Sequence, residues 1–162
     1  MTDISRRNFV KASSIAGLGA LMLPNPILSI APRSNHTTKI RMGFIAVGFR
    51  GQVHVDELAK RDDVEIIAFA DPDTEMMALA QDVLKQHQRP PAHAYTDGPY
   101  AYRELLARND IDAVIISSPW EWHRVQGVDA MRAGKVVGME VCGAMTLGDC
   151  WEFVRAYEET KV

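Results

Sequence analysis

The sequence predicts an α/β fold, a doubly wound parallel sheet with helices on both faces. From residue 40 onward, short apolar segments alternate with amphipathic ones, a pattern typical of consecutive strand–helix–strand units. The first apolar segment also runs into a glycine-bearing turn and then a helical segment, as in dinucleotide-binding (Rossmann) folds. We therefore expect residues 39–162 to form one domain of this kind, preceded by a separate segment at 1–38.

The strands are predicted from short apolar runs. The runs at 41–47, 64–70 and 113–117 are almost continuously apolar, as expected of parallel strands that are covered on both faces. Strands at 92–95 and 136–140 complete the alternation. All of them are separated by segments long enough for a helical crossover, which parallel pairing requires.

The helices are predicted from helical spacing and from residues that begin or end helices. Met77, Ala80 and Leu84 share one face of the second helix, and Thr74 is its cap or a first-turn residue. Gly134 follows the fourth helix, at the position where glycine commonly ends helices. The expected helices span residues 52–61, 74–88, 100–108, 121–133 and 147–160.

The turn after the first strand reads Ala46-x-Gly48-x-x-Gly51, with Phe49 and Arg50 between the glycines. In a G-x-G-x-x-G turn the glycines permit a tight bend, close approach of a pyrophosphate and close packing of the helix, whose N-terminus attracts the anion. Alanine replaces the first glycine here. Glycine turns after strands are common, so a purely structural turn is the alternative.

An acidic residue ends the second strand. Asp71 follows the apolar run 64–70, roughly twenty residues beyond the turn, where dinucleotide folds place the acid that binds the adenosine ribose. A carboxylate there repels a 2′-phosphate, so NAD is favoured over NADP. The alternative is a turn and helix cap formed by 71–73. Strand, turn, helix, strand and acid occur in the right order, which favours nucleotide binding.

An unusual cluster follows the fourth strand, where open α/β sheets bind ligands. It lies in the run 117–126, from Ser117 to Gln126, and consists of Trp120, Glu121, Trp122 and His123 at the start of a predicted helix. A surface loop has no stability reason to carry two indoles so close together, so we expect a binding wall. The alternatives are packing of Trp122 on a neighbouring domain and a His123 ring that is satisfied by backbone.

Composition excludes some classes. The formal net charge is −3 and there is no basic stripe, so nucleic acid is not an expected partner. Cys142 and Cys150 are predicted to be two buried free thiols rather than a disulfide. Neither has histidine and acidic neighbours at ligand spacing, so no metal site is expected.

The N-terminal segment predicts export. Residues 5–11, which include Arg6 and Arg7, match the twin-arginine signal, and an apolar stretch follows at 12–23. That stretch is too short to span a membrane comfortably and is typical of a signal-peptide core. We expect residues 1–38 to be signal and linker, the partner to be the twin-arginine export machinery, and the destination to be the periplasm. The alternative is a basic amphipathic start of a folded domain.

Residues 40–162 resemble the Gfo/Idh/MocA oxidoreductase superfamily, and most closely its NAD-dependent glycosidase branch, family 109 of the glycoside hydrolases. Ordinary members carry a Pro-Asn-x-x-His loop and a Glu-Lys-Pro motif with a catalytic lysine. This chain has Glu140-Val141-Cys142 without the lysine, which favours the glycosidase branch. The resemblance rests on residues 48–52, 70–73, 119–123 and 138–141.

The resemblance implies a role for each residue of an NAD site. The pyrophosphate of NAD would bind at the glycine turn, and its adenosine ribose would bind the acid after the second strand. The nicotinamide would lie against the tryptophan cluster and the end of the fifth strand. The implied cofactor-binding residues are Gly48, Phe49, Arg50, Gly51, Asp71, Trp120, Glu121, Trp122, His123, Glu140 and Val141.

The resemblance also implies an activity: hydrolysis of a glycoside with a terminal N-acetylgalactosamine by C3 oxidation, elimination, water addition and re-reduction. Such members have a six-stranded dinucleotide domain followed by a second α/β domain. We therefore expect the chain to be truncated before the sixth strand and the second domain, with the catalytic acid and base beyond Val162. A homo-oligomer is possible in this family. The alternatives are a sugar or cyclitol dehydrogenase and a non-catalytic nucleotide-binding module.

Overall fold

The computed structural model describes residues 39–162. The predicted export signal and linker at 1–38 lie outside the described residues, so export remains a prediction. Within residues 39–162 no helix is both long and apolar enough to cross a membrane.

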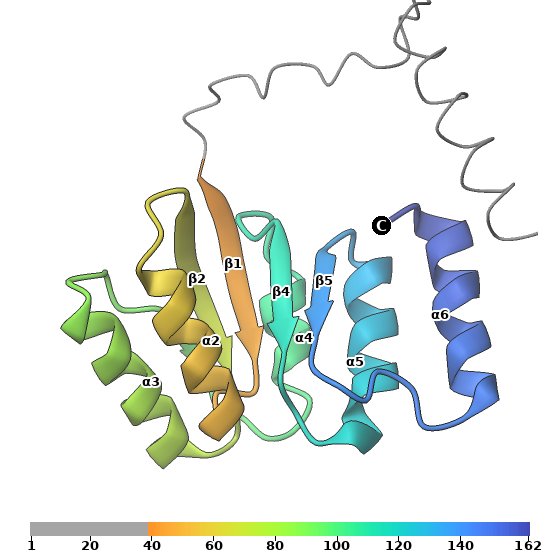
Figure 1. The fold of residues 1–162 in the computed structure, drawn as a ribbon, viewed down its shortest axis with the longest axis horizontal. Helices are drawn as coiled ribbons and strands as arrows, with labels where there is room; N and C mark the ends of the chain where they lie inside the picture. Colours follow the sequence, from red (N-terminus) through yellow and green to blue (C-terminus); the bar gives the residue numbers. More distant parts are fainter. Residues whose placement is uncertain (1–38) are drawn as a thin grey trace, which may run out of the picture. The chain divides into compact units, whose positions relative to one another are not determined.

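The described residues form a five-stranded sheet in the order β3-β2-β1-β4-β5 (Figure 1). Every neighbouring pair of strands is parallel. The strands are β1 Ile40–Ile45, β2 Val64–Ala70, β3 His93–Tyr95, β4 Ala113–Ile116 and β5 Val136–Met139. The helices are α2 Phe49–Ala59, α3 Thr74–Gln86, α4 Tyr102–Leu106, α5 Trp120–Arg132 and α6 Leu147–Thr160.

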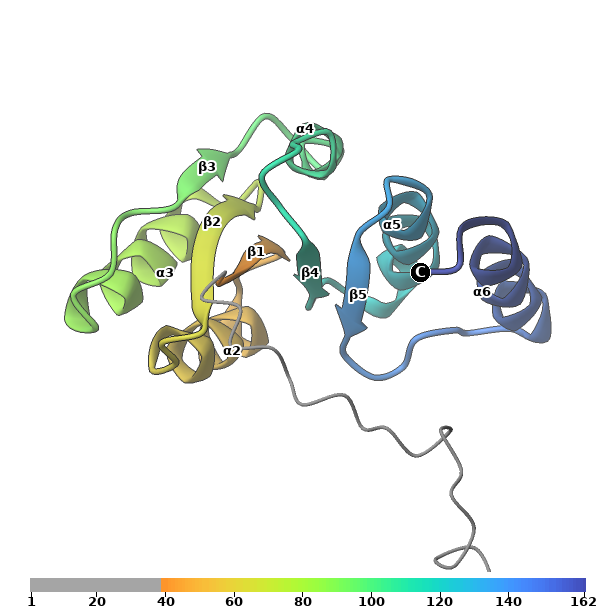
Figure 2. The same cartoon turned by 90° about the horizontal axis from the view of Figure 1, so that it is seen from above.

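Helices cover both faces of the sheet (Figure 2). On one face Val55 of α2 and Leu84 of α3 pack with Phe44. On the other, Leu105 of α4 and Ala130 of α5 pack with buried strand residues. The predicted doubly wound parallel sheet is therefore confirmed, and its two cores hold the strand ends in place on either side.

The order and type of the predicted elements are confirmed, but several boundaries differ. The first helix begins at Phe49 instead of residue 52, because Gly48 is its N-cap, so the glycine turn merges with the first helical turn. The strand before it ends at Ile45, because Ala46 bends the chain with φ 67°. The third predicted helix, 100–108, is a single short turn at Tyr102–Leu106, since the chain before it bends at Gly98 with φ 87°.

The cysteines are not buried as predicted. Cys142 and Cys150 are free, but both are exposed. Cys142 lies in the loop after β5 and Cys150 in the first turns of α6. Neither segment has a further layer of described residues over it, so small apolar side chains there remain accessible.

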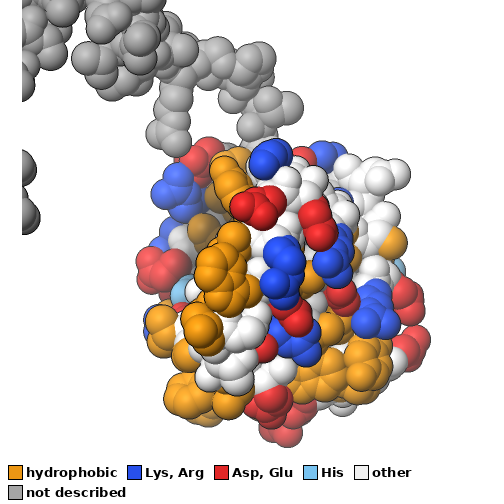
Figure 3. All heavy atoms as spheres, turned by 90° about the vertical axis from the view of Figure 1, so that its right-hand side faces the viewer, with side chains coloured by type: hydrophobic (Ala, Val, Ile, Leu, Met, Phe, Trp, Pro, Cys, Tyr) orange, Lys and Arg blue, Asp and Glu red, His pale blue; other side chains and the backbone are white. Residues whose placement is uncertain are grey.

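Apolar side chains are also exposed on the α6 side of the domain, which faces the viewer in Figure 3 and where they lie beside charged side chains. Among the described strands β5 has a neighbour only on its β4 side, and a groove of about 690 Å³ runs between β5 and α6. The large side chains exposed on α6 are Leu147, Trp151, Val154 and Tyr157.

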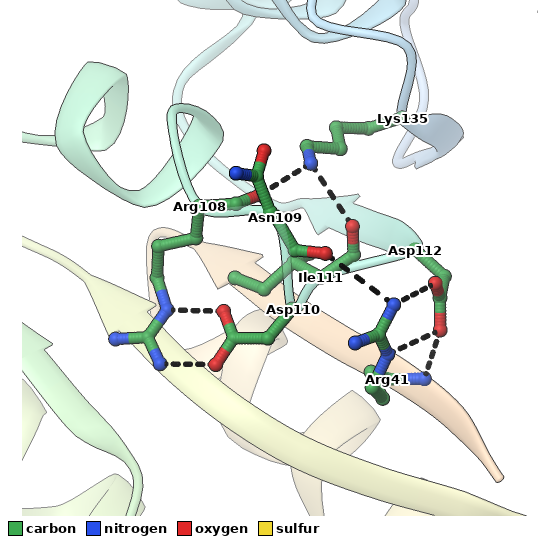
Figure 4. Close-up of polar contacts among 7 residues, drawn as sticks. All are labelled: Arg41, Arg108, Asn109, Asp110, Ile111, Asp112 and Lys135. Carbon is green, nitrogen blue, oxygen red and sulfur yellow. Dashed lines mark hydrogen bonds and ion pairs between the residues drawn. The ribbon is translucent and has the colours of Figure 1, made fainter.

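Ionic contacts tie the amino ends of the strands together (Figure 4). Arg41 of β1 binds the Asp112 carboxylate through Nε at 3.0 Å and Nη2 at 2.6 Å. Lys135, which is buried, donates from Nζ to the carbonyls of Arg108 at 2.5 Å and Ile111 at 3.0 Å. These contacts hold the segment before β4 against β1 and the start of β5.

The Arg41–Asp112 pair predicts a pH-dependent contribution to stability. The Arg41 guanidinium lowers the pKa of Asp112 from 3.8 to about 2. Because the folded pKa is depressed, the stabilisation is present above the unfolded value and is lost as the pH falls through about 2. We expect Asp112→Asn to lower the free energy of unfolding near neutral pH by less than about 1 kcal/mol, the usual worth of a partly exposed ion pair.

Urea unfolding of the wild type and Asp112→Asn between pH 7 and pH 3 measures this. The difference in the free energy of unfolding between the two proteins should be constant down to about pH 4 and should become smaller below that pH. Asp62→Asn, at a fully exposed carboxylate whose nearest arginine nitrogen is 3.9 Å away, is the control. A difference that does not change with pH would show that the Asp112 charge is not involved.

Candidate functional site

A cavity of about 380 Å³ opens at the carboxyl ends of β1, β2 and β4. This is the edge where open α/β sheets bind ligands, at the point where the strand order reverses. Its walls come from the turns after these strands, the segment before α4 and the first turns of α3 and α5. The lining residues are Ile45, Ala46, Gly48, Ala70, Asp71, Pro72, Asp73, Met76, Gly98, Pro99, Tyr102, Ser117, Ser118, Pro119, Trp122 and Gln126.

Each small residue in the turn after β1 has a different steric role. A Cβ on Gly51 would lie 2.4 Å from the carbonyl oxygen of Ala46, so only glycine lets α2 pack this closely on the strand. Ala46 has φ 67°, a conformation that costs an L-residue roughly 1–2 kcal/mol. A Cβ on Gly48 would meet nothing within 4 Å. Gly48 therefore leaves open space at the cavity, where a ligand could approach the backbone.

The start of α2 is suited to an anion. No acidic side chain lies in its first turn and no side chain caps it, so its first N–H groups and its dipole are available to a negative group. Phe49 is 93% exposed and the Arg50 side chain 61% exposed. Both stand at the rim of the site, outside the residues that line the cavity.

Asp71 lines the cavity and is buried. Its Oδ2 accepts from the Val47 N–H at 2.8 Å and its Oδ1 from the Asp73 N–H at 2.9 Å. Each carboxylate oxygen can accept more than one hydrogen bond, so both can still accept from a ligand hydroxyl. Asp73, not Asp71, is the N-cap of α3, accepting from Glu75 and Met76. The cap alternative thus applies to Asp73, while Asp71 forms the turn of the same alternative through the Asp73 N–H and also lines the cavity.

The opposite wall is formed by the end of β4 and the start of α5. The Ser117 hydroxyl is buried and has no hydrogen-bond partner among the described residues. The neighbouring Ser118 donates to Gln126 Oε1 at 2.6 Å. Buried hydroxyls nearly always have a partner, so the Ser117 hydroxyl, on the cavity wall, is free to bind a polar group of a ligand.

Aromatic rings close one side of the cavity. Trp122 meets Tyr100 edge to face, with ring centroids 5.4 Å apart. Tyr102 donates to Asp129 Oδ2 at 2.7 Å, and burial together with Asp129 raises its pKa to about 12, so its hydroxyl stays protonated. Trp122 therefore packs within this domain rather than only against a neighbouring one, and it still lines the cavity.

His123 lies behind this wall and is fully buried. Its Nδ1 is 2.8 Å from the Cys142 carbonyl oxygen and its Nε2 is 2.8 Å from the Ser118 carbonyl oxygen. The ring therefore links the loop after β4 to the loop after β5. Its position matches the alternative of a ring satisfied by backbone, because it has no exposed surface to present to a cofactor.

The loop after β5 approaches the start of α2. Glu140 Oε1 lies 2.5 Å from Arg50 Nε and 2.6 Å from His54 Nε2. Arg50, and after it His54, hold the pKa of Glu140 below its ordinary value. Val141 is exposed. The structure thus brings together Arg50 and Glu140, which the sequence placed at opposite ends of the expected site.

The predicted site residues divide into three groups. Those that line the cavity are Gly48, Asp71 and Trp122. Those exposed at the carboxyl edge outside the cavity lining are Phe49, Arg50, Trp120, Glu121 and Val141. Those that lie behind the surface or between elements are Gly51, His123 and Glu140. Contact of each with a cofactor stays a prediction.

Several lining residues received no individual role from the sequence, although Ser117 and Gln126 are the two ends of the run 117–126 that was expected to bind a ligand. Gln126 follows Trp122 and Pro119 at helical spacing, so the period of the helix could have identified it. Ser117 directly follows the apolar run of β4, a position that also signals the site. Tyr102 and Pro99 reach the cavity from the segment after the short strand β3, and no sequence pattern places that segment.

These features fit a dinucleotide. The open space at Gly48 and the uncapped first turn of α2 suit a diphosphate. The buried Asp71 and the Ser117 hydroxyl, which has no partner among the described residues, can bind the polar groups of the attached ribose. Across residues 39–162, no group of three or more His, Cys, Asp or Glu is placed to hold a metal ion.

Comparison with known proteins agrees with this geometry. Residues 40–162 match the Gfo/Idh/MocA family model, described as an oxidoreductase family with an NAD-binding Rossmann fold. A glycosyl hydrolase family 109 protein of Shewanella baltica is 37% identical over 99% of this chain and 38% of its own length. The alpha-N-acetylgalactosaminidase of Shewanella oneidensis is 36% identical over the same shares. The chain thus spans 38% of the length of these relatives.

Solved structures give the same fold. The WlbA dehydrogenase of Chromobacterium violaceum, in complex with NADH and UDP-GlcNAcA, is 27% identical with a TM-score of 0.65, over 76% of this chain and 33% of that one. The myo-inositol dehydrogenase of Lactobacillus casei, in complex with NAD(H) and myo-inositol, is 26% identical with a TM-score of 0.64, over 75% and 34%. The predicted Rossmann fold, NAD cofactor and superfamily resemblance are confirmed.

The His123 contacts predict a loss of stability on substitution. Leucine has a similar size but no N–H, so His123→Leu would remove the hydrogen bond that the ring donates to one of the two carbonyls, that of Ser118 or that of Cys142. We expect the free energy of unfolding to fall by on the order of 1–3 kcal/mol, the usual cost of an unsatisfied buried acceptor. Urea unfolding measures it, with His93→Leu at an exposed histidine as control. An unchanged midpoint would mean that the ring does not link the loops.

Proposed function

Because the chain belongs to the Gfo/Idh/MocA oxidoreductase family, we propose that it is the NAD-binding part of an NAD-dependent glycosidase that acts on terminal N-acetylgalactosamine. The observation that carries the NAD site is the open space at Gly48 beside the buried Asp71 and the unpartnered Ser117 hydroxyl. The glycosidase activity is supported by the similarity to the family 109 relatives. It is also supported by the tryptophan cluster and by Glu140-Val141-Cys142, which lacks a lysine.

Each wall has a defined task in this proposal. The first turn of α2 binds the diphosphate through backbone N–H groups and the helix dipole. Asp71 accepts from the adenosine ribose hydroxyls, and its charge selects against a 2′-phosphate, so NAD is preferred to NADP. Trp122 and Tyr100 limit the access of water to the cavity from the side of α4.

When bound, NAD would supply a hydride acceptor that is regenerated within each turnover, so the overall reaction is a hydrolysis. The residues of this chain hold and orient the cofactor and exclude water. Paired carboxylates of the kind that ordinary glycosidases use are not required by such chemistry.

Gly48→Val tests the NAD site. A Cβ at this position would meet no described atom within 4 Å apart from its chain neighbours, so we expect the fold to be kept while the space for the diphosphate is filled. We expect NAD affinity to fall at least about tenfold, equivalent to 1.4 kcal/mol, in calorimetric titration with no change in thermal midpoint. Gly148→Ala on α6 is the control. Wild-type affinity in Gly48→Val would refute the placement of the diphosphate.

A chimera tests the reaction. Residues 40–162 would replace the matching segment of the Shewanella oneidensis alpha-N-acetylgalactosaminidase. We expect the chimera to release p-nitrophenol from p-nitrophenyl α-N-acetylgalactosaminide without accumulating NADH, and the same chimera with Asp71→Ala to lose most of this activity. Both proteins would first be shown to be folded by circular dichroism.

The outcomes separate the candidate functions. A folded, NAD-binding chimera that accumulates NADH with free sugars would favour the dehydrogenase, as in the solved structures of similar fold. One that binds NAD and turns over neither substrate would favour the non-catalytic nucleotide-binding module. Either result would overturn the glycosidase proposal.

A further inference from the structure

Glu140 joins two parts of the site that are far apart in the sequence. It directly follows β5, and its side chain is 18% exposed. Arg50 and His54, both on α2, contact the same oxygen of its carboxylate, Oε1. Residues at i and i+4 lie on one face of a helix, so a single carboxylate holds one face of the first turns of α2 against the loop after β5.

The contact uses only part of the arginine. Arg50 donates to Glu140 through Nε, and among residues 39–162 no partner is recorded for its two Nη groups. A guanidinium carries five N–H donors in a rigid plane. Fixing Nε therefore also fixes the direction of the Nη donors, although the side chain as a whole is 61% exposed.

Arg50 is located where an anionic ligand would be favoured. Arg50 lies in the first turn of α2, where the helix dipole and free N–H groups favour an anion. A long exposed side chain loses rotamer freedom when it binds a ligand, and an anchor formed beforehand reduces this loss. Among residues 39–162, the backbone N–H of Val141, at 3.3 Å, is the one donor to Glu140 Oε2.

We propose that Glu140 is a positioning residue for the cofactor's diphosphate: it holds Arg50, with His54 as a second contact, so that the free Nη donors bind the diphosphate. The inference rests on the proposed NAD site. It differs from a direct role of Glu140 at the nicotinamide, because a positioning role acts on any ligand that carries the diphosphate. That difference can be measured.

Glu140→Gln keeps the shape of the side chain and removes its charge. Calorimetry with NAD, ADP and adenosine would compare it with the wild type. We expect affinity for NAD and for ADP to fall by the same factor, about tenfold for loss of a charged hydrogen bond, while adenosine binding is unchanged. In an Arg50→Gln background, Glu140→Gln should have no further effect on either ligand.

Two variants keep the test decisive. Arg50→Gln changes an exposed side chain, so it should fold, and it should weaken ADP at least as much as Glu140→Gln does. Glu152→Gln removes a similar arginine contact, Nη1 of Arg124 at 2.8 Å, away from the cavity lining and should change nothing. Folding of each variant is checked by its thermal midpoint.

The results distinguish this inference from the proposed function. Weaker NAD binding with unchanged ADP binding in Glu140→Gln would place Glu140 at the nicotinamide half and overturn the positioning role. Additive effects of the Arg50 and Glu140 substitutions, or unchanged ADP affinity in Arg50→Gln, would also overturn it. A wild-type chain that binds neither NAD nor ADP would instead refute the proposed cofactor site.

Discussion

The buried Asp71 carboxylate connects the two turns from which the site is built. By accepting from the Val47 and Asp73 N–H groups, it holds the end of β1 beside the end of β2. A buried charge is tolerated only when hydrogen bonds compensate it, so these two turns must keep their shape. The close approach of Gly51 to the Ala46 carbonyl then sets the direction in which α2 leaves the sheet, and with it the open space at the cavity.

The two edges of the sheet satisfy their polar groups differently. At the amino edge, Arg41 pairs with Asp112, and Lys135 saturates two backbone carbonyls (Figure 4). At the carboxyl edge, within residues 39–162, the Ser117 hydroxyl has no hydrogen-bond partner and no side chain caps the first turn of α2. A fold that satisfies its buried polar groups at one edge and leaves them available at the other concentrates binding capacity at the second.

The loops after β4 and β5 are held in place by side-chain contacts with neighbouring elements. His123 contacts carbonyls after both β4 and β5, and Glu140 contacts α2 from the end of β5. The loop after β5 is thus tied on both sides. Such contacts restrict the positions of this loop before a ligand arrives, which lowers the conformational entropy lost on binding.

The amino-acid sequence by itself determined the alternation of strands and helices, the doubly wound class, the glycine turn and Asp71. These follow from local periodicity and from spacing within one strand–helix–strand unit. Only the tertiary structure decided that His123 lies behind the wall, that Arg50 pairs with Glu140, and that Tyr102 reaches the cavity. Such contacts join residues far apart in the chain, and their geometry depends on how the strands are ordered and how helices pack, which no local pattern encodes.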